Sequence, residues 1–201
     1  YLAFLVTSRI FNNFKLSLLT GIIFVLHPLN IPCVSYISGR GDLLSVFFIL
    51  LGTLSFIDYI RGSSYLKYLI SVASVLLALL SRENGLLMPF FLGLSGLFLK
   101  SNKRRLLFSL IPFILLDILY LFIRFAYLDP GLYVYYDYVR SLNTFTKIIN
   151  FAHILKNYPG LFLLPFNLHM FRTVPLITKA LSVEAISTVL LISSSLLLIY
   201  Y

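Results

Sequence analysis

Charged side chains are scarce in this sequence, and four of them fall in two short turns between long apolar runs. The first turn contains Arg40 and Asp42, and the second contains Arg82 and Glu83. A guanidinium group binds anionic oxygens, whereas a carboxylate can accept a proton or hold a cation. Charge close to a membrane is expensive unless it has a partner or a task, so these turns are the first candidates for a functional site.

Three more polar residues, one beside the first turn and two inside a later apolar run, are further candidates. His27 precedes Pro28 and is expected at the same membrane level as Arg40 and Asp42. Asp117 and Arg124 lie seven residues apart in a later apolar run, which places them on the same face of a helix. That spacing is too long for a direct ion pair, so we expect each to have another partner.

Each of these residues also has a simpler interpretation. Asp42 is well placed to cap a helix that begins at Leu43. Arg40 and Arg82 could extend from a helix end to the lipid interface without binding a ligand. A histidine before proline, such as His27, is common at the end of a helix. The sequence alone leaves these alternatives open.

The elements that position these turns are predicted to be membrane helices. Of the 201 residues, 60% are hydrophobic and 11% are charged, and the mean hydropathy is +0.96, which is too apolar for a soluble domain. We expect an all-α, polytopic transmembrane bundle with about six to seven membrane helices. The predicted helices span residues 1–8, 16–30, 43–60, 66–80, 86–100, 105–126 and 180–201.

The basic residues indicate how this bundle is oriented. The formal net charge is +9, but the lysines and arginines gather in every second connection between apolar runs. By the positive-inside rule these connections are cytoplasmic, and the turns with Arg40 and Arg82 face the outer or lumenal side. The charge is therefore interpreted as a topology signal with some attraction to anionic lipids, and nucleic acid is not an expected partner.

The chain is predicted to form a single transmembrane domain, residues 1–201, with residues 127–179 as an outer-face loop region. Tyrosines at 133–138 favour the membrane interface, and the proline-bounded segment 158–165 is too short to span, so an interfacial or re-entrant segment is expected. Tyr1 lies inside an apolar run without an initiator methionine, so we expect a fragment truncated at both ends. The one cysteine, Cys33, does not indicate a redox compartment.

Three ordered strings in the sequence resemble one known family. Residues 24–48 read FVLHPLNIPCVSYISGRGDLLSVFF, residues 79–85 read LLSRENG, and residues 158–175 read YPGLFLLPFNLHMFRTVP. Together they resemble the membrane region of transmembrane O-mannosyltransferases that carry tetratricopeptide repeats, and of their bacterial relatives. The family usually has a lysine where this chain has Arg82, and it usually has an arginine at the position of Arg124.

The resemblance implies a GT-C-type glycosyltransferase, which moves a sugar, with mannose as one candidate, from a polyprenyl-phosphate donor to an acceptor hydroxyl on the outer face. The implied donor-phosphate ligands are Arg40, Arg82, Arg124 and His27. Asp42 and Glu83 are the implied catalytic carboxylates. The family's general base would precede Tyr1, and tetratricopeptide repeats, if present, would follow Tyr201. A divalent metal is a candidate cofactor for which no ligands are assigned.

The expected partners are a polyprenyl-phosphate-linked sugar, membrane lipids, and an acceptor protein or glycan. The expected location is a bacterial cytoplasmic membrane, or the endoplasmic reticulum membrane if the source is eukaryotic. The alternative function is a transporter or flippase that binds lipid-linked sugar phosphates without chemistry. An inverted repeat of the helix pattern would favour that alternative, and an upstream acidic pair would favour the enzyme.

Overall fold

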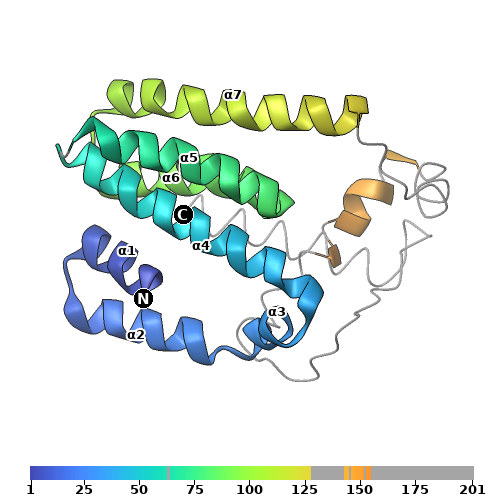
Figure 1. Ribbon diagram of the computed structural model, residues 1–201, viewed down its shortest axis with the longest axis horizontal. Coiled ribbons are helices and arrows are strands. Elements are labelled where there is room, and N and C mark those ends of the chain that lie inside the picture. The colour runs from blue at the N-terminus through green and yellow to red at the C-terminus, as the bar shows by residue number, and fades with distance from the viewer. Residues whose placement is uncertain (63, 128–142, 145, 152, 155–201) are drawn as a thin grey trace. The chain divides into compact units, whose positions relative to one another are not determined.

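The computed structural model describes residues 1–62, 64–127, 143–144, 146–151 and 153–154, and all regular structure within these ranges is helical. The all-α class is therefore confirmed for the described residues. The chain forms two compact units, Tyr1–Asp129 and Pro130–Tyr201, and the candidate site lies in the first (Figure 1). Residues 146–151 of the second unit are helical. The predicted re-entrant segment at 158–165 and the predicted helix at 180–201 lie outside the described residues.

Two short helices begin the first unit as an antiparallel hairpin. α1 spans Leu2–Phe11 and α2 spans Phe14–Leu26. Asn12 adopts the left-handed conformation between them, with φ of 50°, which asparagine tolerates better than most residues. The side chain of Asn13 then caps α2 by accepting a hydrogen bond from the Leu16 N–H at 3.2 Å.

Pro28 ends α2, because the residue before a proline is disfavoured in helical conformation. His27 is extended, with ψ of 124°, and three short elements follow it. They are η1 (Pro28–Asn30), α3 (Ile31–Ser35) and η2 (Ile37–Gly39). Gly39 is required here, since a Cβ atom at this position would lie 2.8 Å from the backbone of Cys33.

The centre of the unit is a hairpin of α4 (Arg40–Ile60) and α5 (Tyr65–Ser81), the most extensively packed helix pair of this unit (Figure 1). Small residues allow the two helices to approach closely. A Cβ atom on Gly52 would lie 2.9 Å from that of Ser74. Close approach through small residues is typical of helix pairs in membranes, where packing replaces the hydrophobic effect. Because α4 and α5 are antiparallel, the first turn of α4 lies beside the end of α5.

The last two helices cover this hairpin. The 3-10 segment η3 (Glu83–Leu87) leads into α6 (Met88–Phe98), and α7 spans Lys103–Tyr127. The ring of Phe113 on α7 lies 5.7 Å from that of Phe56 on α4, centroid to centroid, and both side chains are fully buried. The hydroxyl of Tyr68 donates to the Ser109 carbonyl at 2.9 Å, which joins α5 to α7 at a buried position.

Fewer helices than expected are long enough to cross a bilayer. Among the described residues, Ile37–Ile60 and Lys103–Ala126 qualify by length and hydropathy, and the pair Phe14–Leu26 and Pro28–Ser35, bent by 50°, adds a third if it forms one span. α5, with 17 residues, covers only about 25 Å of the roughly 30 Å hydrocarbon core. The expected six to seven membrane helices are thus too many for the described part. The apolar runs are divided by turns such as η3 into segments that are individually too short.

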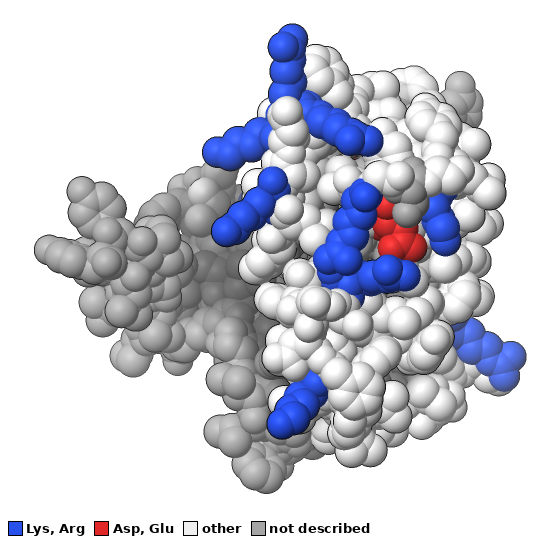
Figure 2. All heavy atoms as spheres, turned by 90° about the vertical axis from the view of Figure 1, so that its left-hand side faces the viewer, with Lys and Arg blue, Asp and Glu red and all other residues white. Residues whose placement is uncertain are grey.

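The basic residues of the helix connections gather at one end of this unit, which we call the basic end. Figure 2 views the unit from this end and shows cationic side chains around acidic atoms. α1, α4 and α6 finish at this end, and α2, α5 and α7 begin there (Figure 1). The residues of the basic end are Arg9, Lys15, Arg61, Lys67, Lys100, Lys103, Arg104 and Arg105. We call the opposite end, with Arg40, Asp42, Arg82, Glu83 and Arg124, the site end.

The two ends should differ in their access to an external reagent. In a Cys33→Ser background, Ser38→Cys at the site end should be labelled in intact cells by a membrane-impermeant maleimide. Lys103→Cys at the basic end should be labelled only after permeabilisation, because basic connections stay on the cytoplasmic side. Labelling of Lys103→Cys in intact cells, with Ser38→Cys protected, would reverse the predicted orientation.

Candidate functional site

The two charged turns meet at the site end because the α4–α5 hairpin brings them together. Asp42 is on the first turn of α4, and Arg82 is the residue that follows α5. Gly41 permits the contact, since a Cβ atom at Gly41 would lie 3.1 Å from the Ser81 carbonyl oxygen. Residues some forty positions apart in sequence thus become neighbours.

An ion pair between Arg82 and Asp42 forms the centre of this site. The Nε atom of Arg82 lies 3.1 Å from Oδ1 of Asp42, and its Nη1 donates to the Ser38 carbonyl at 3.3 Å. The amide of Asn84 donates to the same Oδ1 of Asp42 at 3.1 Å. Asp42 therefore fixes the orientation of Arg82, whereas Nη2 of Arg82 makes no hydrogen bond to any described residue.

The structure contradicts the interpretation of Asp42 as a helix cap. α4 begins at Arg40 rather than at Leu43, with Gly39 at the N-cap position and no side-chain cap. Asp42 is the third residue of the helix, and its carboxylate turns toward Arg82 and Asn84. It still interacts favourably with the helix dipole, which attracts negative charge in the first turn.

The backbone after α5 directs these side chains toward α4. Arg82 is extended, with φ of −164° and ψ of 157°, and stops the helix. η3 then folds back against the last turn of α5, so closely that a Cβ atom at Gly85 would lie 2.7 Å from the Leu79 nitrogen. Only glycine fits this approach without displacing backbone.

A second ion pair joins η3 to the end of α7. Nη2 of Arg124 lies 2.5 Å from Oε1 of Glu83, and Nη1 of Arg124 donates to the hydroxyl of Tyr120 at 3.2 Å. Arg124 is thus held by two partners, and it anchors α7 at the same end as the Arg82–Asp42 pair. Its charge is balanced by Glu83, whose side chain is exposed.

Arg40 differs from the other two arginines of the site. It is exposed on the first turn of α4, and among the described residues no carboxylate lies within ion-pair distance of it. His27 has a local role, because its Nδ1 accepts the Leu29 N–H at 3.3 Å and caps η1. The charge of Arg40 is therefore not neutralised by any carboxylate in the described part of the chain.

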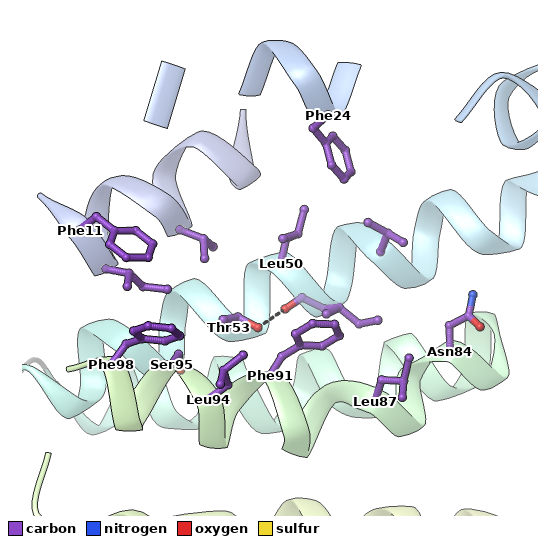
Figure 3. Close-up of a pocket in the computed structure, with 14 residues that line it drawn as sticks. Phe11, Phe24, Leu50, Thr53, Asn84, Leu87, Phe91, Leu94, Ser95 and Phe98 are labelled. Carbon is purple, nitrogen blue, oxygen red and sulfur yellow. Dashed lines mark hydrogen bonds between the residues drawn. The ribbon is translucent and has the colours of Figure 1, made fainter. Parts of the chain in front are cut away.

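An apolar groove of about 570 Å³ lies between α1, α2, α4, η3 and α6 and reaches the site end (Figure 3). Phe11 and Phe98 line the end near the basic residues, and Leu50 and Phe91 line the middle. Asn84, which also binds Asp42, is the lining residue at the other end. Asn84 therefore lines the apolar groove and also contacts the Arg82–Asp42 ion pair.

Almost every side chain on the wall of this groove is apolar or internally satisfied. The hydroxyl of Thr53 donates to the Ile49 carbonyl at 2.7 Å, the bond marked in Figure 3. Ser95 likewise donates to the Leu92 carbonyl at 2.8 Å. Neither hydroxyl demands a polar ligand, so the groove suits a hydrocarbon chain.

The sequence interpretation overlooked Asn84, Tyr120 and the groove. Asn84 stands directly after Glu83 in the charged turn, so its amide could have been included with that turn. Tyr120 precedes Arg124 by one helical turn, which is a recognisable spacing for a hydrogen bond. No sequence signal marks the groove, because four separate helices and the 3-10 segment η3 line it.

Within the described ranges, no three histidine, cysteine, aspartate or glutamate side chains are grouped so as to hold a metal ion. No family model, curated protein or solved structure matches this chain. The functional argument therefore rests on the geometry of the site end and its groove.

Proposed function

We propose that this chain is part of a GT-C-type membrane glycosyltransferase that transfers a sugar from a polyprenyl-phosphate donor. The main support is the apolar groove that ends at Asn84, beside the Arg82–Asp42 pair and the first turn of α4. A lipid-linked sugar phosphate has the same order of parts, with a long hydrocarbon chain attached to an anionic head.

In this proposal the groove holds the first isoprene units and the arginines bind the phosphate. Arg40 offers a guanidinium that no described carboxylate pairs with, and Arg82 offers the Nη2 group that its described partners leave unused. A guanidinium matches the spacing of phosphate oxygens and binds them in a bidentate manner. Arg124 is already paired with Glu83, so we assign it a positioning role in place of direct phosphate contact.

The reaction exchanges one bond at the sugar. The acceptor hydroxyl oxygen attacks the anomeric carbon, the bond from that carbon to the phosphate oxygen breaks, and the hydroxyl proton passes to a carboxylate. Negative charge then grows on the departing phosphate, where fixed cationic donors stabilise the transition state. Asp42 holds Arg82 in place for this step.

The proposal also includes the expectations from the sequence about the general base, the metal, the acceptor and the location of the enzyme. The resemblance places the general base before Tyr1, leaves Glu83 as a further carboxylate near the acceptor, and allows a divalent metal. The complete bundle would contain more spanning helices than the described part, and the acceptor would be a protein or glycan on the outer face. The enzyme would reside in a bacterial cytoplasmic membrane or in the endoplasmic reticulum membrane.

Narrowing the groove should weaken binding of a long-chain donor. Leu94→Trp adds bulk to the groove wall, and a misfit in an apolar pocket typically weakens binding by about tenfold or more. We expect this variant to bind a polyprenyl-phosphate sugar about tenfold more weakly than wild type, measured by fluorescence titration in detergent. A donor analogue with a single isoprene unit should bind both proteins equally.

Leu115→Trp provides the matched control, because Leu115 is an exposed residue of α7 outside the groove. Equal donor affinity of Leu94→Trp and Leu115→Trp would contradict the assignment of the groove. Tight donor binding by the full-length protein without any sugar transfer would favour the transporter alternative.

A further inference from the structure

Positive charge at the basic end far exceeds the acidic charge available to balance it. Eight lysines and arginines belong to these helix connections, and Asp58 is the only acidic residue in the sequence from Tyr1 to Arg105 that is not at the site end. Asp58 is 13% exposed and pairs with two of them, since its carboxylate oxygens lie 3.5 Å from Arg9 Nε and 3.8 Å from Lys67 Nζ. Its charge is therefore already shared.

Arg61 and Arg105 are left without a carboxylate partner among the described residues. Arg61 donates a hydrogen bond to the backbone carbonyl of Arg9, and the Arg105 guanidinium lies 5.3 Å from the centroid of the Tyr59 ring. Both contacts orient the side chain without neutralising its charge. Two guanidinium groups are thus fixed and free to bind an anion.

These two arginines share a hollow of about 340 Å³ between the α4–α5 turn and the α6–α7 connection. Asn102 also lines it, and its Oδ1 accepts the Arg104 N–H at 3.0 Å. That bond leaves the amide nitrogen of Asn102 as a further donor for an anionic oxygen. The lining residues are Ile60, Arg61, Leu99, Ser101, Asn102 and Arg105.

The position of the hollow favours a lipid over a small soluble anion. Ile60 and Leu99 provide apolar walls at the ends of α4 and α6. In the predicted membrane orientation these helix ends lie at the cytoplasmic membrane surface. Tyr59 lies near the end of α4 and Tyr65 begins α5, and their rings are in contact, as aromatic residues gather at a bilayer interface. A phospholipid places its phosphate at this level and its acyl chains against the neighbouring apolar surface.

We propose that this hollow is a binding site for the phosphate of an anionic phospholipid on the cytoplasmic side, separate from the donor site. Arg61 and Arg105 bind the phosphate oxygens, Asn102 donates an additional hydrogen bond, and the acyl chains lie along Ile60 and Leu99. Basic pockets between membrane helices on this side are suited to such head groups. This site would tie the α4–α5 hairpin to α7.

The test is the affinity of the detergent-solubilised full-length protein for single phospholipid molecules, measured by native mass spectrometry. Phosphatidylglycerol should bind at least tenfold more tightly than phosphatidylcholine. A cation near an anionic lipid surface contributes about fivefold, so Arg61→Ala/Arg105→Ala should lower phosphatidylglycerol affinity by about thirtyfold. Arg61→Lys/Arg105→Lys should lose less, since it keeps the charge but not the planar fork.

Lys15→Ala/Lys103→Ala is the matched control, because it removes two charges from the same end without changing a lining residue of the hollow. This control should change the affinity less than about threefold. Equal losses in the two alanine double variants would show diffuse attraction only and overturn the proposal. Displacement of phosphatidylglycerol by excess inorganic phosphate would also overturn it, by identifying a soluble anion as the ligand. If the alanine variant does not fold, Arg61→Gln/Arg105→Gln removes the same two charges with polar side chains and gives the same comparison with the control.

Discussion

Arg40→Ala and Arg82→Ala should each lower sugar transfer by the full-length protein about a hundredfold, because loss of one preorganised donor to developing charge costs roughly 3 kcal/mol. Turnover should be measured with a polyprenyl-phosphate sugar in detergent or proteoliposomes. Stability should change little in both cases. Arg40 makes no ion pair with a described residue, and the Arg82–Asp42 pair is partly exposed, with side-chain exposures of 48% and 25%. Such pairs contribute about 1 kcal/mol or less.

Replacing Arg40 or Arg82 with lysine separates the effect of the positive charge from the effect of the planar guanidinium group. Relative to the alanine variants, Arg82→Lys should recover more transfer activity than Arg40→Lys. The family that this sequence resembles usually has lysine at the Arg82 position. Lys15→Ala, which removes a charge at the basic end, is the control and should retain full transfer. If both alanine variants fold normally and transfer sugar at the wild-type rate, the phosphate role is refuted and the arginines are interface anchors.

Gly85→Ala should destabilise the protein by about 2–3 kcal/mol, in the upper range for inserting a methyl group into a packed site. The new Cβ atom would lie 2.7 Å from the Leu79 nitrogen and 2.8 Å from the Ala78 carbonyl carbon, and backbone atoms cannot move aside alone. We expect η3 to shift away from α5, which would separate Arg82 from Asp42. Both the thermal unfolding midpoint and donor binding should therefore fall.

Gly93→Ala is the matched control for this prediction. Gly93 lies in α6, and a Cβ atom there would meet only the Leu110 Cδ1 atom, at an ordinary distance of 3.5 Å. Since alanine has a higher helix propensity than glycine, by about 1 kcal/mol, this variant should be as stable as wild type or more so. A Gly85→Ala protein with unchanged melting and donor affinity would show that the close approach is unimportant.

The helices could be predicted from the sequence because a run of neighbouring apolar residues indicates each of them. Residues 43–60, 66–80 and 105–126 were expected to be helical, and α4, α5 and α7 differ from these ranges by at most three residues at either end. Long apolar runs must satisfy their backbone groups internally, and the helix does so within one segment. The interruptions were harder to place. η3 and Pro89 shorten α6, so the number of spanning helices was overestimated.

The roles of single residues depended on which helices pack together. Asp42 looked like a cap because the start of α4 was expected three residues too late. Arg124 was expected to have a partner other than Asp117, and the structure supplies Glu83, 41 positions earlier. The charge of a residue is visible in sequence, but its partner is fixed by the contact between separate helices.

The sequence by itself determined that the chain is helical and apolar, and that its basic connections alternate with its charged turns. These properties follow from hydrophobicity and charge summed over neighbouring residues, which need no knowledge of tertiary contacts. Only the tertiary structure decided that Asp42 holds Arg82, that no carboxylate among the described residues pairs with Arg40, and that the groove reaches Asn84. Those features arise where small residues such as Gly41, Gly52 and Gly85 let distant backbones approach, and a contact of that kind has no periodic signature in the sequence.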